Sequence, residues 1–173
     1  MKLVEPTMAY DRQIQAFRQE FLDAGSSTDG SSSLKRFDTT RQWLDYVEQF
    51  KSPETTPTGY VPATQYIYVR ETDGKIVGMI QIRHTLTDGN RYAGHIGYSV
   101  CPSERRKGYA TRMLEQTLPL CRALGLERVY IACAPENEGS RRTILNNGGV
   151  YEATAYWPER DRYLEQYRID LPT

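Results

Sequence analysis

The sequence predicts a mixed fold of the α/β (α+β) class, built as one domain over residues 1–173. Two observations predict it. Segments with apolar residues at helical spacing alternate with short β-prone runs, in the order β α α β β β α β α β β. The length of 173 residues suits one compact domain, and we find no internal repeat or linker that would divide it.

The first elements are a strand and two helices. Residues 2–5 form a short apolar-centred run, and Thr7 is placed to cap the helix that follows. Asp38 is placed to cap a second helix over residues 39–50, which carries an apolar stripe. Between these helices, residues 25–33 (GSSTDGSSS) have little apolar surface to offset ordering, so we expect a mobile surface loop. A lid beside the substrate is the alternative.

The middle of the chain predicts three strands. Residues 51–62 contain three prolines and a glycine and are expected to be irregular. Residues 64–71 and 75–84 are rich in β-branched and aromatic residues, and the turn at residues 72–74 between them indicates a hairpin. Residues 91–100 carry a further strand.

The second half alternates helices and strands. Pro119 lies inside the first of these helices and removes a main-chain donor, so we expect a kink there. The expected elements are a helix over residues 109–124, a strand over 128–134, a helix over 139–146 and strands over 150–156 and 163–171.

Composition excludes several classes of protein. Twenty-two Lys and Arg balance 22 Asp and Glu, so we expect no general attraction to nucleic acid or to an anionic membrane. No apolar run is long enough to span a bilayer, and no signal peptide is evident, which favours a cytoplasmic protein. The three cysteines have no CxxC spacing and indicate neither a disulfide framework nor a metal site.

Positive charge is concentrated at one predicted strand-to-helix junction, residues 100–114 (VCPSERRKGYATRML). Pro102 ends the strand because it has no N–H, and Gly108 lets backbone amides approach a ligand closely. The free amides at a helix N-terminus, together with nearby cations, suit a phosphate group. The cations are Arg105, Arg106 and Lys107, although a solvated helix start is the alternative for the last two.

The spacing at this junction selects one kind of phosphate site. The patterns GxxxxGK[ST] and GxGxxG are both absent, which argues against P-loop and Rossmann sites. The pattern Arg105-x-x-Gly108-x-Ala110 resembles the acyl-CoA pyrophosphate loop of the GNAT superfamily of N-acyltransferases. Asn137, Ser140 and the helix-ending Gly148 resemble the second element of that superfamily. The core GHIGYxxxPSERRKGYAT is similar to that of a bacterial branch of predicted acetyltransferases.

This resemblance implies a fold, a cofactor and a set of contacts. The fold is a mixed, mostly antiparallel central sheet flanked by helices, and the cofactor is acetyl-CoA, with CoA as product. Asn137 could cap its helix, contact the ligand or do both. The residues expected to bind the cofactor are Tyr98, Ser99, Val100, Arg105, Arg106, Lys107, Gly108, Tyr109, Ala110, Thr111, Asn137 and Ser140.

The resemblance also implies direct attack of an amine on the acyl carbonyl, with positioning and oxyanion stabilisation as the main catalytic effects. His95 is the first candidate for the general base and His84 the second, although either could be a structural histidine. Ile144 stands where many relatives carry the tyrosine that protonates the thiolate. Cys101 and Cys133 are expected to be buried packing residues rather than nucleophiles.

These observations lead to one main hypothesis and one alternative. We expect an acetyl-CoA-dependent N-acetyltransferase that acts on the primary amine of a small molecule or a peptide. A CoA-binding sensor or interaction module without turnover is the alternative, because the tyrosine is missing. Relatives often form homodimers, so a homodimer is also expected, with no nucleic-acid or membrane partner. The acceptor amine itself is not encoded in any motif.

Overall fold

The computed structural model describes residues 1–172 and confirms the predicted mixed fold. Four strands form the first sheet in the order β1-β2-β3-β4, and every pairing is antiparallel. The predicted hairpin is β2 and β3, which pair along their whole length. The strands of this sheet are β1 (Lys2–Val4), β2 (Ala63–Val69), β3 (Ile76–Arg83) and β4 (Ile96–Val100).

The remaining strands form a second antiparallel sheet, in the order β5-β7-β6. The prediction of one central sheet therefore needs a correction. Within residues 1–172, the two sheets are joined by a single isolated bridge between Gly94 and Ile131. The strands of the second sheet are β5 (Arg128–Cys133), β6 (Val150–Trp157) and β7 (Arg162–Asp170).

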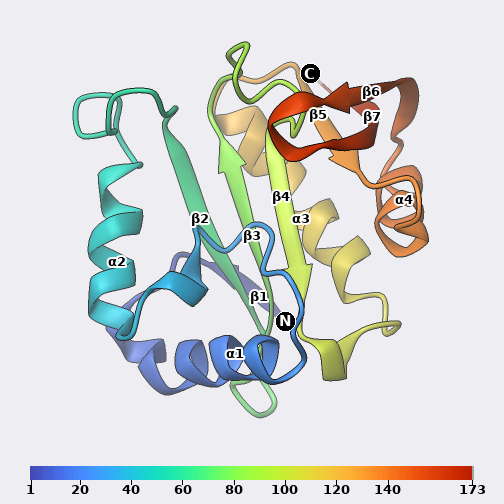
Figure 1. Ribbon diagram of the computed structural model, residues 1–173. Coiled ribbons are helices and arrows are strands. Elements are labelled where there is room, and N and C mark those ends of the chain that lie inside the picture. The colour runs from blue at the N-terminus through green and yellow to red at the C-terminus, as the bar shows by residue number, and fades with distance from the viewer. Residues whose placement is uncertain (173) are drawn as a thin grey trace.

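Helices cover both faces of the first sheet (Figure 1). Two helices lie on one face and a third on the opposite face, while the fourth lies beside the second sheet. They are α1 (Asp11–Asp23), α2 (Thr40–Gln49), α3 (Tyr109–Ala123) and α4 (Glu138–Asn146). Short 3₁₀ turns are η1 (Met8–Tyr10), η2 (Leu34–Arg36), η3 (Pro102–Glu104) and η4 (Pro158–Arg160).

The alternation of side chains along the strands produces two separate cores. In β3, Met79 packs in the core shared with α1 and α2, which contains Phe17 and Trp43. Its neighbour Ile80 points the other way, into the core shared with α3, which contains Met113. The helices are therefore held on the sheet by burial of largely apolar faces.

Two local predictions differ from the structure. Asp38 is not the cap of α2, because Thr39 accepts the main-chain N–H of Gln42 and the Gln42 side chain accepts the N–H of Thr39, which is a capping box. The strand predicted over residues 91–100 is shorter, since regular pairing begins only at Ile96. Residues before it form a turn that ends at the bridge of Gly94.

Replacing Pro119 by alanine is expected to stabilise the protein. The helix α3 continues through Pro119 to Ala123, and the proline ring is exposed, so little packing is lost. Alanine restores a main-chain donor, and a proline in a helix interior costs about 3 kcal/mol relative to alanine. We expect the free energy of unfolding, measured with urea, to rise by about 1–3 kcal/mol. A variant of unchanged or lower stability would show that the surroundings already accommodate the proline.

Candidate functional site

The first and second sheets separate at His95, just before β4 begins. The N–H of His95 donates to the carbonyl of Tyr130 on β5 at 2.7 Å, and the N–H of Tyr130 donates back to Nδ1 of the imidazole at 3.0 Å. The Nδ1 atom of His95 thus accepts a main-chain N–H of β5 that, in a continuous sheet, would donate to a carbonyl of the neighbouring strand. Beyond this point β4 and β5 are not paired within residues 1–172, and we refer to the unpaired interval between the two strands as the opening.

The main chain of β4 has groups available at this opening. In an antiparallel pair, alternate residues direct both main-chain groups to the partner strand. Cys101 donates to β3 at Val77, and the register of the ladder places Ser99 among the residues that also face β3. Tyr98 and Val100 therefore direct their N–H groups toward β5, which does not pair with them. Of the three residues expected to pair with pantetheine, Tyr98 and Val100 have this orientation and Ser99 has the opposite one.

The predicted phosphate loop ends at a helix without a side-chain cap. Gly108 is the N-cap residue of α3, with φ of 76°, and within residues 1–172 the helix has no side-chain cap. Arg106 also has positive φ, 62°, which costs about 1–2 kcal/mol in a residue other than glycine. The amides of Tyr109, Ala110 and Thr111 are at the positive end of the helix dipole and suit an anion.

The cationic side chains of the loop differ in what they contact. Arg105 donates from Nε to the carbonyl of Val100 at 3.2 Å and from Nη2 to Oγ of Ser26 at 2.8 Å. Lys107 donates to a carboxylate oxygen of Glu104 at 2.9 Å. Arg106 is exposed and, among residues 1–172, forms no ion pair with a carboxylate. Arg106 is thus the loop cation whose charge is least engaged within the protein.

The second predicted element lies directly across the opening. Asn137 caps α4 by accepting the N–H of Ser140 at 3.1 Å, so its expected capping role is confirmed. The hydroxyl of Tyr98 lies 2.7 Å from Oγ of Ser140, and this contact connects β4 with the start of α4. Ile144 is fully buried in the core, and Gly148 has φ of 80° at the end of α4, as its predicted role requires.

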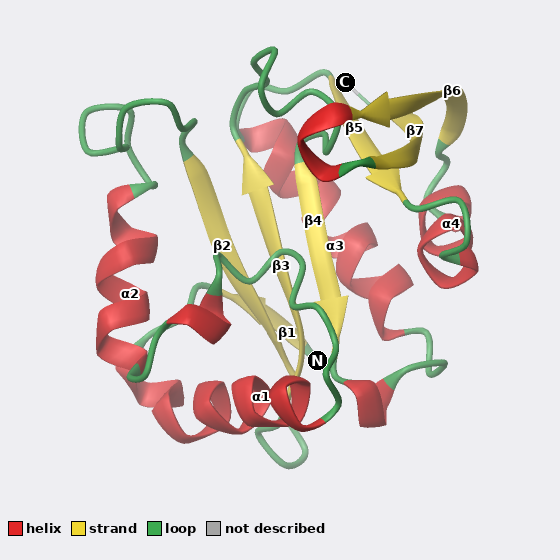
Figure 2. Cartoon of the chain, viewed as in Figure 1, coloured by secondary structure: helices red, strands yellow, loops and turns green. Residues whose placement is uncertain are grey.

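The loop of residues 25–33 is not the mobile surface loop that its composition predicts. It crosses the face of β3 and β4 that also carries α1 (Figure 2). At Gly30, a Cβ atom would lie 2.0 Å from the carbonyl oxygen of Gly97 in β4, so only glycine fits there. Ser31 is fully buried, and its carbonyl accepts the indole N–H of Trp43 at 2.9 Å.

Two glutamines on the sheet hold the same loop in place. Gln65 on β2 pairs across the sheet with Gln81 on β3, and their side chains share a face. Gln65 donates to the carbonyl of Gly30 at 2.8 Å and accepts from Oγ of Ser32 at 2.7 Å, while Gln81 donates to Ser32 at 2.8 Å. Sequence reasoning missed these residues, because a glutamine in a strand does not by itself indicate that a distant loop packs against that strand.

The surroundings of His95 keep its imidazole neutral. Burial, with a smaller contribution from the charge of Arg83, lowers the pKa of His95 to about 4. Because Nδ1 accepts the N–H of Tyr130, the proton of the neutral ring is on Nε2 and neither nitrogen has a free lone pair. The role of His95 as general base stays a prediction, and this geometry disfavours it. His84 lies 2.8 Å from Oγ1 of Thr64, and burial lowers its pKa as well.

The thiols are buried, as expected. Burial raises the pKa of Cys101 to about 12 and that of Cys133 to about 11, so both remain protonated at neutral pH. Cys101 also donates to the carbonyl of Ile76 at 3.3 Å. A protonated, buried thiol is a poor nucleophile.

An opening between two sheets, with strand amides that face it and a helix N-terminus at its end, is the arrangement expected of an acyl-CoA-binding acyltransferase. Residues 31–148 match the sequence model of the Acetyltransferase (GNAT) family. The chain therefore belongs to this family of acetyltransferases. Among curated proteins, no sequence gives a significant match.

Solved structures share the fold at low sequence identity. A ribosomal-protein-S5-alanine acetyltransferase from Vibrio fischeri is 20% identical, with a TM-score of 0.70 over 98% of this chain and 92% of that one. The acetyltransferase yncA from Salmonella typhimurium, with acetyl-CoA bound, is 15% identical, with a TM-score of 0.67 over 99% and 94%. A variant of spermidine N-acetyltransferase from Vibrio cholerae is 12% identical, with a TM-score of 0.63 over 99% and 95%.

None of the helices within residues 1–172 combines the length and the apolar composition that a bilayer span requires.

Replacing Gly30 by alanine is expected to destabilise the protein through its contact with β4. The new Cβ would overlap the carbonyl of Gly97, and neither main-chain segment can move without breaking hydrogen bonds. The matched control is Gly25→Ala, because Gly25 also has positive φ but has nothing within 4 Å of its Cβ position. In urea unfolding, we expect Gly30→Ala to lose about 1–3 kcal/mol more than the control. Equal losses would show that the loop is not packed on β4 in solution.

The stability of the protein is expected to fall in acid because of His95. The pKa of histidine is about 6.5 in an unfolded chain, and that of His95 in the native state is about 4. Between these values the unfolded state binds a proton that the native state does not, so stability is full above pH 6.5 and falls as the pH drops toward 4.

The control for this titration is the variant His95→Gln, which cannot titrate. From pH 7 to pH 5, the wild type should lose about 1–2 kcal/mol more unfolding free energy than this variant. Parallel losses in both proteins would mean that His95 titrates normally in the native state.

Proposed function

We propose that this protein transfers the acetyl group of acetyl-CoA to the primary amine of a small molecule or a peptide by direct attack. The observation that carries the proposal is the opening beyond His95, which has unpaired β4 amides at its side and the uncapped start of α3 at its end. These groups can bind the two parts of the cofactor that require hydrogen bonds, the pantetheine arm and the pyrophosphate.

Each residue of the opening has a proposed task. The main chain of Tyr98 and Val100 binds the pantetheine arm, and the N–H groups that face the opening polarise the acyl carbonyl. The amides of residues 109–111 bind the pyrophosphate, and Arg106 supplies positive charge. Asn137 and Ser140 line the other side of the opening, where Ser140 contacts the Tyr98 hydroxyl.

Acetyl-CoA supplies the acyl group, and the balanced reaction converts an amine and a thioester into an amide and a free thiol. The nitrogen forms a bond to the acyl carbon, the carbon–sulfur bond breaks, the amine loses a proton and the sulfur gains one. A thiol has a pKa of about 8.5, so the thiolate is a tolerable leaving group that water can protonate. The buried Ile144 offers no proton, and His95 has no free lone pair with which to accept one. We therefore propose that water carries the protons.

The structural neighbours favour an amine acceptor without selecting one. Their names refer to an alanine of ribosomal protein S5 in one case and to the polyamine spermidine in another. We propose that the acceptor reaches the acyl group along the wall formed by residues 25–33, which lies against β4. A single domain over residues 1–173, a cytoplasmic location and a homodimer stay predictions from the sequence.

The alternative function is that of a CoA-binding sensor that does not turn over. Two observations favour it: Ile144 replaces the tyrosine of many relatives, and the geometry of His95 disfavours a base. Incubation with acetyl-CoA and a panel of primary amines, with release of free thiol as the readout, separates the two functions. Release that depends on both protein and amine supports the acetyltransferase. Binding of CoA without amine-dependent release supports the sensor.

Replacing Gly108 by valine is expected to abolish CoA binding. Valine is strongly disfavoured at φ of 76°, and its side chain would stand in the open space beside the first amides of α3. We expect the dissociation constant for CoA, measured by calorimetry, to rise at least about tenfold, which corresponds to about 1.4 kcal/mol.

The matched control is Gly125→Val, at the other end of α3. Gly125 also has positive φ, 86°, and nothing lies within 4 Å of its Cβ position. This variant should show a similar loss of stability but near-normal CoA affinity. Similar affinities in both variants would contradict the placement of the pyrophosphate at the start of α3.

A further inference from the structure

Glu104 belongs to the loop that we propose for the pyrophosphate, and its carboxylate is buried. Its side chain is only 7% exposed, whereas Arg105, Arg106 and Lys107, which follow it, are exposed. A buried carboxylate is retained only where it is paired and hydrogen-bonded. Hydrogen bonds from Lys107 and then from Arg70 lower the pKa of Glu104 to about 2, so it is an anion at neutral pH.

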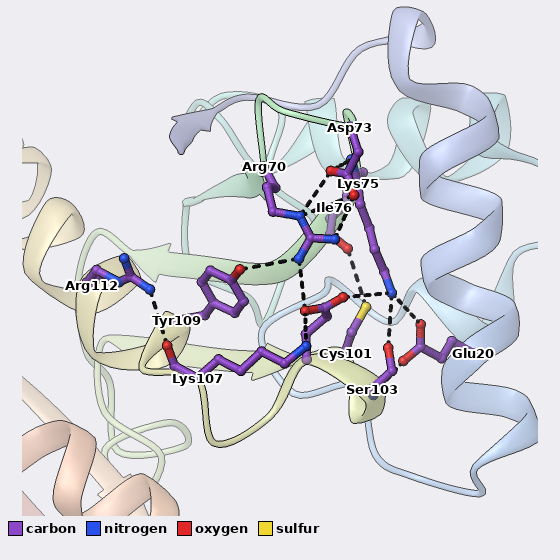
Figure 3. A network of polar contacts seen from close by, with 11 residues as sticks. Glu20, Arg70, Asp73, Lys75, Ile76, Cys101, Ser103, Lys107, Tyr109 and Arg112 are labelled. Carbon is purple, nitrogen blue, oxygen red and sulfur yellow. Dashed lines mark hydrogen bonds and ion pairs between the residues drawn. The ribbon is translucent and has the colours of Figure 1, made fainter.

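Three cations converge on this carboxylate from two parts of the chain (Figure 3). Lys107 lies within the loop itself, and its Nζ is 2.9 Å from Oε2 of Glu104. Arg70 and Lys75 come from the hairpin between β2 and β3, with Nη1 of Arg70 at 2.9 Å from Oε2 and Nζ of Lys75 at 3.2 Å from Oε1. Glu104 therefore ties the loop to the β2–β3 turn at one end of the first sheet.

The hairpin cations also hold the two ends of the loop. Nη1 of Arg70 donates to the hydroxyl of Tyr109, the first residue of α3, at 3.2 Å, and its remaining nitrogens donate to Asp73. Lys75 donates to Oγ of Ser103 at 3.0 Å, at the start of the loop. Both ends are thus attached to the same hairpin, and the carboxylate of Glu104 contacts the same two cations.

The part of the loop between these attachments has a conformation that needs support. Arg106 and Gly108 both have positive φ, and this geometry sets where the first amides of α3 point. We propose that Glu104 is a positioning residue for the cofactor, which holds the loop of residues 102–108 in the conformation that binds the pyrophosphate without touching the ligand. This inference rests on the proposed function and adds to it a residue that no motif identified.

Simple electrostatics and the positioning role predict opposite effects of removing the charge of Glu104, so the sign of the change in CoA affinity distinguishes them. Removing a negative charge close to a polyphosphate site should strengthen CoA binding by Coulomb's law. It should also release Lys107, which the sequence predicts as a phosphate ligand in its own right. If Glu104 positions the loop, its neutral variant instead binds CoA more weakly. Lys107 then loses its carboxylate partner, Arg70 and Lys75 keep only Asp73 and Glu20, and the loop is no longer tied to the hairpin through Glu104.

The experiment is a calorimetric titration of CoA into the full-length wild type and the variant Glu104→Gln. Glutamine keeps the size of the side chain and removes its charge. The matched control is Glu71→Gln, since Glu71 belongs to the same hairpin but pairs with the N-terminal amine. We expect the dissociation constant for CoA to rise about tenfold in Glu104→Gln and to remain within twofold of the wild type in the control.

Each outcome has a defined meaning. Weaker binding by Glu104→Gln with a normal control supports the positioning role. Equal or tighter binding overturns it and favours Lys107 as a direct phosphate ligand. A wild type that binds no CoA overturns the proposed function itself, which is a different result.

A second variant covers the case in which Glu104→Gln fails to fold. Tyr109→Phe removes the hydrogen bond from Arg70 to the first residue of α3 without changing any charge. We expect it to raise the dissociation constant for CoA about twofold to fivefold, and unchanged affinity would overturn the inference.

Discussion

The reciprocal contact between His95 and Tyr130 determines where the two sheets separate. Gly94 lies so close to β5 that a Cβ atom there would be 2.2 Å from the carbonyl oxygen of Tyr130, so the strands are in full contact at this point. One residue later, the imidazole of His95 accepts the N–H of Tyr130 in place of a main-chain carbonyl. The ladder cannot continue past a side chain, and the opening begins there.

The opening has a wall on the α1 side that depends on close packing of main chain on main chain. Gly30 is in contact with Gly97 of β4, and the buried side chain of Gln65 on β2 donates a hydrogen bond to the carbonyl of Gly30. Arg105, which belongs to the pyrophosphate motif, donates to Ser26 in this same loop and to Val100 in β4. One side chain therefore connects the proposed phosphate site with the wall along which we propose that the acceptor approaches.

The chemistry of the opening favours positioning over side-chain catalysis. The cysteines are protonated and buried, and His95 is neutral with no free lone pair on either ring nitrogen. What the opening offers is preorganised main-chain N–H groups, which stabilise negative charge without reorganisation. This arrangement suits a reaction in which the thioester is already reactive and the amine needs only to lose a proton to become a nucleophile.

The order of the elements and the phosphate loop could be predicted from the sequence, because they depend on local patterns. Each of these patterns can be recognised within about a dozen residues of sequence. They are the alternation of apolar residues, the strand end at Pro102 with the glycine at Gly108, and the spacing from Arg105 to Ala110. They were enough to predict the family, the cofactor and the helix that presents its amides. The capping of α4 by Asn137 and the end of that helix at Gly148 were predicted in the same way, and the structure confirms both.

Contacts between distant residues could be decided only by the tertiary structure. A Ser- and Gly-rich segment predicts mobility by composition, yet Gly30 and Ser31 are ordered by Gln65 and Trp43 from other elements. Lys107 was expected to face a phosphate, but it pairs with Glu104, whose other partners come from a hairpin more than 25 residues earlier. Local sequence determines which backbone conformations are favourable, whereas the burial and pairing of a polar side chain depend on which distant segments the fold brings against it.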